Sequence, residues 1–227
     1  MRLIITRPEG DAVSLQTKLA GMGHVSILVP LLKIVPRTHV KIPQKDYQLI
    51  CATSANALKY VKASERLKQI PVLTVGPQSL AAAKLAGFKS CTAQGGDVHG
   101  LADCIIENFN PQMGPILYLS GAEVSADLQL ILAAKKFAVE KVVLYDAVIQ
   151  PPNEIKQNLA TADGVLLYSP RSARIWVDLI ATSNLETAAA APIYYCLSKN
   201  VANMLPQHWQ TRVAKTPDEA AMLALLD

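Results

Sequence analysis

Apolar residues fall into short continuous runs, and most of these runs are followed by a stretch in which apolar residues recur at helical spacing. Runs without apolar and polar alternation are typical of strands that are buried on both faces of a sheet. The runs lie at residues 2–6, 47–52, 72–75, 89–93, 115–119, 164–167, 193–197 and 212–214. This alternation of strands and helices predicts an α/β protein whose parallel sheets are covered by helices on both faces.

Two longer apolar stretches, 26–36 and 142–152, end at prolines. Proline lacks a backbone N–H and fixes φ, so Pro36 and the pair Pro151–Pro152 indicate where each strand must stop. We interpret both stretches as strands that cross between two lobes.

An internal repeat supports two lobes. Residues 1–36 and 114–150 both follow the order strand, turn, helix and crossing stretch, whereas 47–106 and 163–226 both contain repeated strand–helix units. The pattern leaves two pairings open, because the four segments can pair consecutively or in a nested arrangement.

For the last helix, Thr216 as N-cap, Pro217 at the first position and Glu219 at the third predict a capping box.

Composition narrows the classes of protein. Of 227 residues, 51% are hydrophobic and 18% charged, which favours packed cores over disorder. The net charge of +4 comes without a block of basic residues, so nucleic-acid binding is not indicated and a small anionic ligand suits the charge. No apolar run reaches the roughly 18–20 residues of a membrane span. We therefore expect a cytoplasmic monomer.

Metal binding is not expected. The four cysteines are scattered without a C-x-x-C spacing, and the four histidines form no pair spaced as metal ligands. The glycine pattern of a nucleotide-binding loop is also missing.

Polar residues gather in the turns that follow the predicted strands. Ligands of open parallel sheets bind beyond the carboxyl ends of the strands. Hydroxyls and helix N-terminal amides there suit carboxylates or phosphates, although the same residue types also serve as helix caps. Arg7 fits either an anion contact or a salt bridge between loops. The candidate substrate-binding residues are Arg7, Thr53, Ser54, Asn56, Gly76, Ser79, Ser120, Gly121, Ser169, Ser172, Ser198 and Lys199.

Tyr145 is the candidate catalytic residue. A phenol on a crossing strand can donate a proton or a hydrogen bond to a ligand held between lobes. The alternative is a tyrosine that only packs at the hinge.

Several short motifs together resemble the uroporphyrinogen-III synthase family. They are IITRP at residues 4–8, TSANA at 53–57, TVGPQSLAAAKLAGF at 74–88, YLSG at 118–121, VLYDAV at 143–148, LLYSPRSA at 166–173 and AKTPDEA at 214–220. The resemblance implies two flavodoxin-like lobes in the nested pairing, residues 1–35 with 149–227 and residues 40–143, joined by linker strands near 32–39 and 143–149.

The resemblance also implies a reaction. A synthase of this family needs no cofactor and cyclises hydroxymethylbilane, a linear tetrapyrrole with many carboxylates, with loss of water and inversion of ring D. Tyr145 matches the family's tyrosine, which assists loss of the hydroxyl. The hydroxyls of the family's turns match Ser54, Ser79 and Ser169, and main-chain amides bind the carboxylates.

The chain departs from the family in two turns. In the first, Ser79 followed by Leu80 stands where the family often has threonine before alanine, and the second is the turn at Ser198. Ser198 stands where the family has glycine, and Val201 where it often has threonine, so Ser198 or Asn200 is the candidate replacement for that hydroxyl. Two rival hypotheses remain. One is a two-lobed module that binds an anion or tetrapyrrole without catalysis, or a degenerate relative of the synthases; the other is a flavodoxin-like cofactor enzyme. The missing phosphate loop and the low aromatic content of 5% disfavour the latter.

Overall fold

The structure is a computed structural model that describes residues 1–124, 126–150 and 155–226. The chain divides into two compact units. Unit 1 comprises Met1–Lys33 and Val148–Asp227, and unit 2 comprises Ile34–Ala147. The chain therefore passes from one unit to the other twice.

Unit 1 is built on a five-stranded sheet with the order β11-β10-β9-β1-β2, in which each pair of neighbours is parallel. Its strands are β1 (Arg2–Ile5), β2 (Val25–Leu28), β9 (Gly164–Leu167), β10 (Ile193–Cys196) and β11 (Thr211–Val213). Its helices are α1 (Glu9–Gly21), α6 (Ile155–Ala160), α7 (Pro170–Thr182), α8 (Glu186–Ala189), α9 (Lys199–Ala202) and α10 (Glu219–Leu223).

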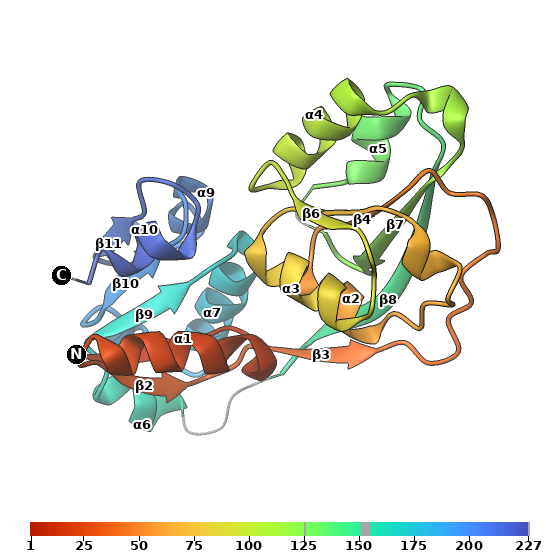
Figure 1. The fold of residues 1–227 in the computed structure, drawn as a ribbon. Coiled ribbons are helices and arrows are strands. Elements are labelled where there is room, and N and C mark those ends of the chain that lie inside the picture. Colours follow the sequence, from red (N-terminus) through yellow and green to blue (C-terminus); the bar gives the residue numbers. More distant parts are fainter. Residues whose placement is uncertain (125, 151–154, 227) are drawn as a thin grey trace. The chain divides into compact units, whose positions relative to one another are not determined.

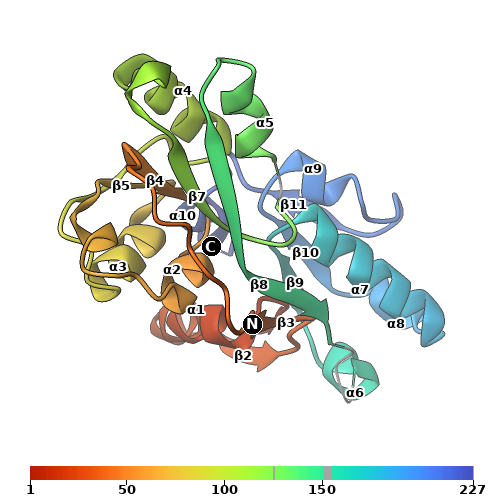
Figure 2. The same ribbon diagram turned by 90° about the vertical axis from the view of Figure 1, so that its right-hand side faces the viewer.

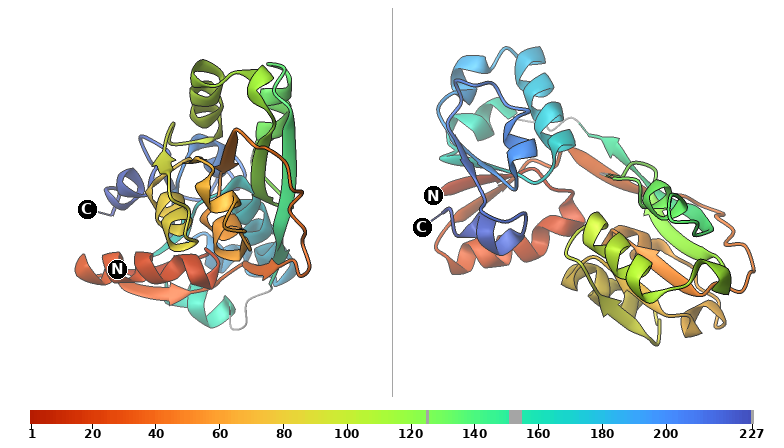
Figure 3. Two further views of the ribbon diagram at one scale, coloured as in Figure 1. Left: turned by 45° about the vertical axis from the view of Figure 1, so that its right-hand side comes forward. Right: turned by 90° about the horizontal axis from the view of Figure 1, so that it is seen from above.

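Both faces of this sheet are buried, because successive strand residues point to opposite sides. Ile4 and Val165 pack in one cluster with residues of α6, α7 and α9. Leu3 and Leu166 pack in another cluster with residues of α1 and α10. Figure 3 shows α1 and α7 on opposite sides of the sheet. Continuous apolar strands follow from this two-sided burial.

Unit 2 holds most of a six-stranded sheet with the order β3-β8-β7-β4-β5-β6. The strands are β3 (Leu32–Pro36), β4 (Leu49–Ala52), β5 (Val72–Thr74), β6 (Cys91–Ala93), β7 (Ile116–Gly121) and β8 (Val139–Ile149). The helices are α2 (Ala55–Tyr60), η1 (Leu67–Gln69), α3 (Pro77–Leu85), α4 (Val98–Asn108), η2 (Pro111–Met113) and α5 (Leu128–Ala133). One face packs against α2 and α3 and the other against α4 and α5 (Figure 1).

Strand β3 is the exception to parallel pairing. The N–H of Arg37 donates to the carbonyl of Leu144 at 2.8 Å, and the N–H of Gln150 donates to the carbonyl of Leu31 at 2.9 Å. Residue numbers that rise on one strand while they fall on the other show that β3 and β8 run antiparallel. The long β8, with 11 residues, is the green strand near the centre of Figure 2.

The repeated segments share sheets in the nested arrangement. Strand β1 pairs with β9, and β4 pairs with β7. If β7 is counted as the first strand of unit 2, then β8 is the second and β4, β5 and β6 are the third to fifth. The order β8-β7-β4-β5-β6 then corresponds to β2-β1-β9-β10-β11 of unit 1. The predicted α/β class, with parallel sheets flanked by helices, is confirmed.

One prediction about a crossing stretch is wrong. Residues 26–36 do not form a single strand, because β2 ends at Leu28 in the sheet of unit 1 and β3 begins at Leu32 in the other sheet. Pro30, which has no N–H to donate to a ladder, lies between them. Pro151 and Pro152, which were expected to end the second stretch, lie outside the described residues.

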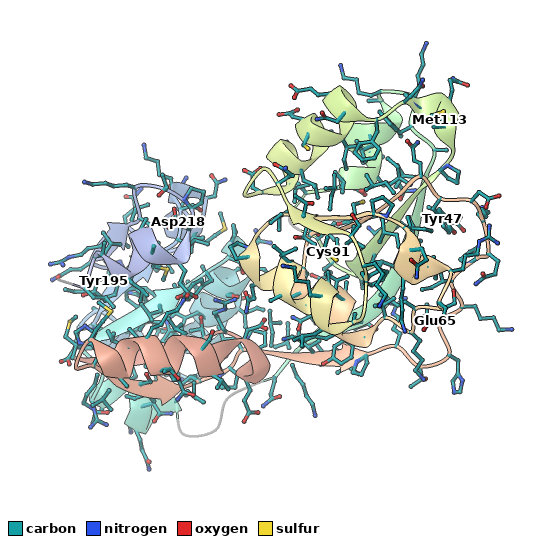
Figure 4. All side chains as sticks on the ribbon, viewed as in Figure 1. Tyr47, Glu65, Cys91, Met113, Tyr195 and Asp218 are labelled. Atoms are coloured by element: carbon teal, nitrogen blue, oxygen red, sulfur yellow. The ribbon has the colours of Figure 1, made fainter. Side chains whose placement is uncertain are left out.

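The predicted cap of the last helix is also wrong. Helix α10 begins at Glu219, and Asp218 is its N-cap, with Oδ1 accepting from the N–H of Ala221 at 2.8 Å. The hydroxyl of Thr216 instead donates to Oδ2 of Asp218 at 2.6 Å. A carboxylate is among the strongest N-cap acceptors, which explains why the helix starts after Asp218 rather than after Thr216. Figure 4 labels Asp218 beside α10.

Candidate functional site

In unit 2 the predicted residues lie along one edge of the sheet, where β4, β5 and β7 end. Thr53 and Ser54 directly follow β4, and Gly76 follows β5 after one intervening residue. Ser120 and Gly121 are the last two residues of β7. Tyr145 of β8 is the register partner of Gly121, so it stands level with the same edge.

The ring of Tyr145 rests against the α-carbon of Gly121. A β-carbon on Gly121 would lie 2.6 Å from Cζ and 2.8 Å from the hydroxyl oxygen of Tyr145. Tyr145 is 8% exposed, and its carbonyl accepts from the N–H of Ala122 at 3.0 Å. The register shifts between Ser120 and Gly121, which places Tyr145 rather than Leu144 opposite the glycine. Only a residue without a side chain allows this ring position.

A second set of hydroxyls lies at the same edge. The hydroxyls of Thr53 and Tyr118 are 3.0 Å apart. Ser120 is fully buried, and its Oγ has no hydrogen-bond partner in the described part of the chain. Burial raises the pKa of Tyr118 to about 12, and Tyr145 adds a smaller upward contribution. The Tyr118 phenol is therefore protonated at neutral pH and can act as a donor.

The sequence analysis did not select Tyr118, although a usable signal exists. Residues two apart in a strand lie on the same face, so Tyr118 shares the face of Ser120. In the sequence, a tyrosine inside an apolar run reads as a core residue.

Ser54 and Ser79 have different local roles. Ser54 is the N-cap of α2, and its Oγ accepts from the N–H of Asn56 at 3.2 Å. Asn56 is 8% exposed, and its Oδ1 accepts from Nζ of Lys59 at 3.2 Å. Ser79 is buried at the third position of α3, whose N-cap is Gly76. A β-carbon on Gly76 would have nothing within 4 Å, so packing does not demand a glycine there.

Replacing each serine by alanine tests these roles. We expect both Ser54→Ala and Ser79→Ala to raise KM for the substrate. Ser54→Ala should also lower the free energy of unfolding by about 1 kcal/mol, because it removes an N-cap. Steady-state kinetics and thermal unfolding measure both effects. A variant that changes only the melting temperature has lost a structural role alone.

In unit 1 the corresponding edge carries Thr6, Ser169 and Ser198 after β1, β9 and β10. The hydroxyl of Thr6 donates to the carbonyl of Leu166 at 2.8 Å, and this bond ties two neighbouring strands together. Ser169 caps α7 by accepting from the N–H of Ser172 at 3.0 Å, and the two hydroxyls are 2.9 Å apart. These two hydroxyls therefore lie together, although Ser172 belongs to the first turn of α7 and not to the loop before it, because α7 begins at Pro170.

Ser198 and Lys199 lie in the next turn. Ser198 occupies the N-cap position of α9 without a side-chain capping bond, and Lys199 is exposed. The Ser198 hydroxyl is therefore not committed to the cap of this helix, which is one of the positions where the family resemblance fails.

Arg7 forms the salt bridge that was one of its two predicted roles. Its Nη1 lies 3.0 Å from Oε2 of Glu219, and its guanidinium lies over the ring of Tyr168, 4.7 Å from the centroid. Sequence reasoning missed both partners. Glu219 was assigned to a capping box, and Tyr168 was read only as the start of a turn.

Each unit thus presents hydroxyls and helix N-termini at the carboxyl edge of its sheet, a donor-rich chemistry that suits carboxylates. Among the described residues, no group of three His, Cys, Asp or Glu side chains could hold a metal ion. None of the helices in the described ranges is both long enough and apolar enough to cross a membrane.

Comparisons with known proteins agree on one family. A family model described as "Uroporphyrinogen-III synthase HemD" matches residues 13–224. The structure of the Helicobacter pylori uroporphyrinogen-III synthetase is similar, with a TM-score of 0.69 and 16% identity over 100% of this chain and 98% of that one. A mutant uroporphyrinogen III synthase from the extremely thermophilic bacterium Thermus thermophilus has a TM-score of 0.55 and 12% identity over 100% and 97%. No curated protein sequence matches the chain.

Proposed function

The chain belongs to the uroporphyrinogen-III synthase family, a family of lyases of haem biosynthesis, and on this premise we propose how it works. Its substrate is hydroxymethylbilane, which it closes to uroporphyrinogen III with loss of water and inversion of ring D. The observation that carries the proposal beyond family membership is the fixed position of Tyr145 against Gly121, beside an edge rich in hydroxyls.

We infer that the two units are flavodoxin-like lobes joined by a two-stranded linker. The order β2-β1-β9-β10-β11 supports this, because it is the 2-1-3-4-5 order of flavodoxin-like sheets. The matching order of unit 2, read from β7, supports a second lobe of the same kind. The pair β3 and β8, in which the chain passes between units, supplies the linker strands.

In the proposed mechanism, Tyr145 assists the departure of the substrate hydroxyl by donating a hydrogen bond or a proton to it. The hydroxyl leaves as water, and the remaining methylene-pyrrole cation is attacked by the substituted carbon of ring D. In the spiro intermediate the bond from that carbon to the methylene bridge of ring C breaks. The freed methylene then bonds to the unsubstituted α-carbon of ring D, which loses its proton, and this exchange produces the inversion. A rigid donor suits this step, because the donor must keep its place while the substrate changes.

Substrate carboxylates bind at the strand ends in this proposal. In unit 2 the donors are the hydroxyls and amides around Thr53, Ser54, Asn56, Gly76 and Ser79. In unit 1 they are those around Ser169, Ser172, Ser198 and Lys199, with Arg7. Support comes from their common position beyond the carboxyl ends of parallel strands. The proposed reaction uses no cofactor.

A coupled assay tests the function. Hydroxymethylbilane is generated in place, the protein is added, and the porphyrin isomers are separated after oxidation. We expect predominantly the type III isomer, whereas the reaction without protein closes the ring without inversion. Type I isomer at the uncatalysed rate, from folded protein, would favour the non-catalytic binding module instead.

A further inference from the structure

Four side chains, those of Arg7, Lys18, Tyr168 and Glu219, form a connected cluster in unit 1. Arg7 follows β1 and Tyr168 follows β9, and these strands are neighbours in the sheet. Glu219 is the first residue of α10, and Lys18 lies in the last turn of α1. All four residues therefore come from different elements of the same unit.

Glu219 is shared by two cations. Its Oε2 lies 3.0 Å from Nη1 of Arg7, and its Oε1 lies 2.5 Å from Nζ of Lys18. If Arg7 exchanged this carboxylate for another, Glu219 would still be paired with Lys18. The exchange therefore leaves no carboxylate without a cation, which lowers its free-energy cost.

Tyr168 contacts the guanidinium of Arg7 through the face of its ring. The guanidinium carbon lies over the face of the ring, 4.7 Å from its centroid. Such a cation–π contact leaves N–H groups of the guanidinium available for a carboxylate. Of the three nitrogens of the Arg7 guanidinium, Nη1 is the one that contacts Glu219 in the described structure.

The hydroxyl of Tyr168 is a second indication of a ligand. It is buried, and no acceptor for its proton lies within hydrogen-bond distance among the residues that the structure describes, since its charged neighbour Arg7 can only donate. Burial raises the pKa of this phenol and Glu219 raises it further, whereas Arg7 lowers it by its charge and by a hydrogen bond. The net effect is a raised pKa, so the group stays protonated. A phenylalanine would provide the same ring without the free-energy cost of a buried O–H group that lacks an acceptor. The Tyr168 hydroxyl is therefore a hydrogen-bond donor beside the Arg7 guanidinium, and the guanidinium can exchange Glu219 for another carboxylate.

We propose that Arg7, Tyr168 and Glu219 form a carboxylate-exchange subsite. Glu219 occupies the guanidinium in the free protein, and a substrate carboxylate replaces it on binding while Lys18 retains Glu219. Tyr168 is a positioning residue that keeps the guanidinium in place during the exchange. This inference rests on the proposed function, and it deepens the predicted role of Arg7 by adding an internal competitor and a support.

The decisive variant is Glu219→Gln, because exchange predicts that removal of the competitor strengthens binding. The probe is uroporphyrin I, an octacarboxylate, titrated against the intact protein by fluorescence. We expect Kd to fall about threefold, within the range of a partly exposed ion pair. Glu186→Gln is the matched control, since it makes the same charge change at the first residue of α8 in the same unit. Its Kd should equal that of the wild type.

Four further variants complete the test. Arg7→Gln should raise Kd about tenfold, as expected when a charge-assisted hydrogen bond to a carboxylate is lost. In Arg7→Gln/Glu219→Gln the second change should bring no further tightening, because the competitor acts only through Arg7. Tyr168→Leu should raise Kd more than Tyr168→Phe does, because phenylalanine keeps the ring beneath the guanidinium.

The outcomes separate this inference from the proposed function. If Glu219→Gln weakens binding, or matches Glu186→Gln, then Glu219 has a structural role and the exchange subsite is rejected. Melting temperatures of all variants show whether a loss of binding comes from unfolding. If the wild type forms no type III isomer but the Kd values follow the expected order, the subsite stands and the synthase function fails.

Discussion

Gly121→Ala is expected to lower kcat of the synthase reaction about a hundredfold or more, because the new methyl group needs the space that the Tyr145 ring occupies. The β-carbon would lie 2.6 Å from Cζ of that ring, a distance that forces the ring to move. Misplacement of a catalytic group by about 1 Å can reduce a rate by about a hundredfold. The overpacked edge should also destabilise the fold by about 1–3 kcal/mol.

Two controls show whether the effect of Gly121→Ala acts through Tyr145. Gly21→Ala adds the same methyl group at the end of α1, where nothing lies within 4 Å, and should retain wild-type activity. In the double variant Gly121→Ala/Tyr145→Phe, the loss of kcat should be close to the larger single loss, because both changes impair the same group. Additive losses would show that Gly121 contributes by another route.

Tyr145→Phe should reduce kcat between about tenfold and a hundredfold, at the lower end of what a positioned proton donor contributes. KM should change little, since phenylalanine keeps the ring against Gly121 and leaves the strand edge in place. The change should not unfold the protein, because the loss of a single hydrogen bond lowers stability by about 1 kcal/mol. Single-turnover kinetics with isomer analysis would show slower loss of the substrate hydroxyl.

Tyr195→Phe is the matched control for the phenol. Tyr195 is 1% exposed in β10, and among the described residues its hydroxyl makes a weak contact with the sulfur of Met1 at 3.7 Å. The variant should therefore behave as the wild type in the assay. If Tyr145→Phe were equally active at an unchanged melting temperature, Tyr145 would have no part in the mechanism.

The fold class was readable from the sequence because burial on both faces leaves a direct mark. Residues such as Leu49 and Ile50 are fully buried on opposite faces of one sheet, so the strand has no polar alternation. Such runs, with glycines and prolines between them, suffice to predict parallel sheets covered by helices. The break between β2 and β3 was missed because apolar residues continue through it, and only the change of sheet separates the two strands.

Site residues in turns were easier to predict than their partners. Ser54 and Ser169 follow strands and precede helices, a local pattern that the sequence contains in full. Tyr168 and Glu219 are far apart in the sequence, and their relation to Arg7 depends on how three elements pack. Gly121 was selected, but its close contact with Tyr145 requires the register shift between β7 and β8, which has no sequence signal.

The nested path of the chain sets an order for folding during synthesis. Unit 2 is one continuous segment, Ile34–Ala147, whereas unit 1 needs both Met1–Lys33 and the residues from Val148 onward. As the chain leaves the ribosome, β1 and β2 emerge first, but β9, the partner on the other side of β1, arrives only after the whole of unit 2. Because domains generally fold as units, unit 2 should complete its structure before unit 1 can. Leu3, Ile4 and Ile5 are fully buried in the folded protein. In the nascent chain these residues therefore lack their final packing partners until unit 2 has been synthesised.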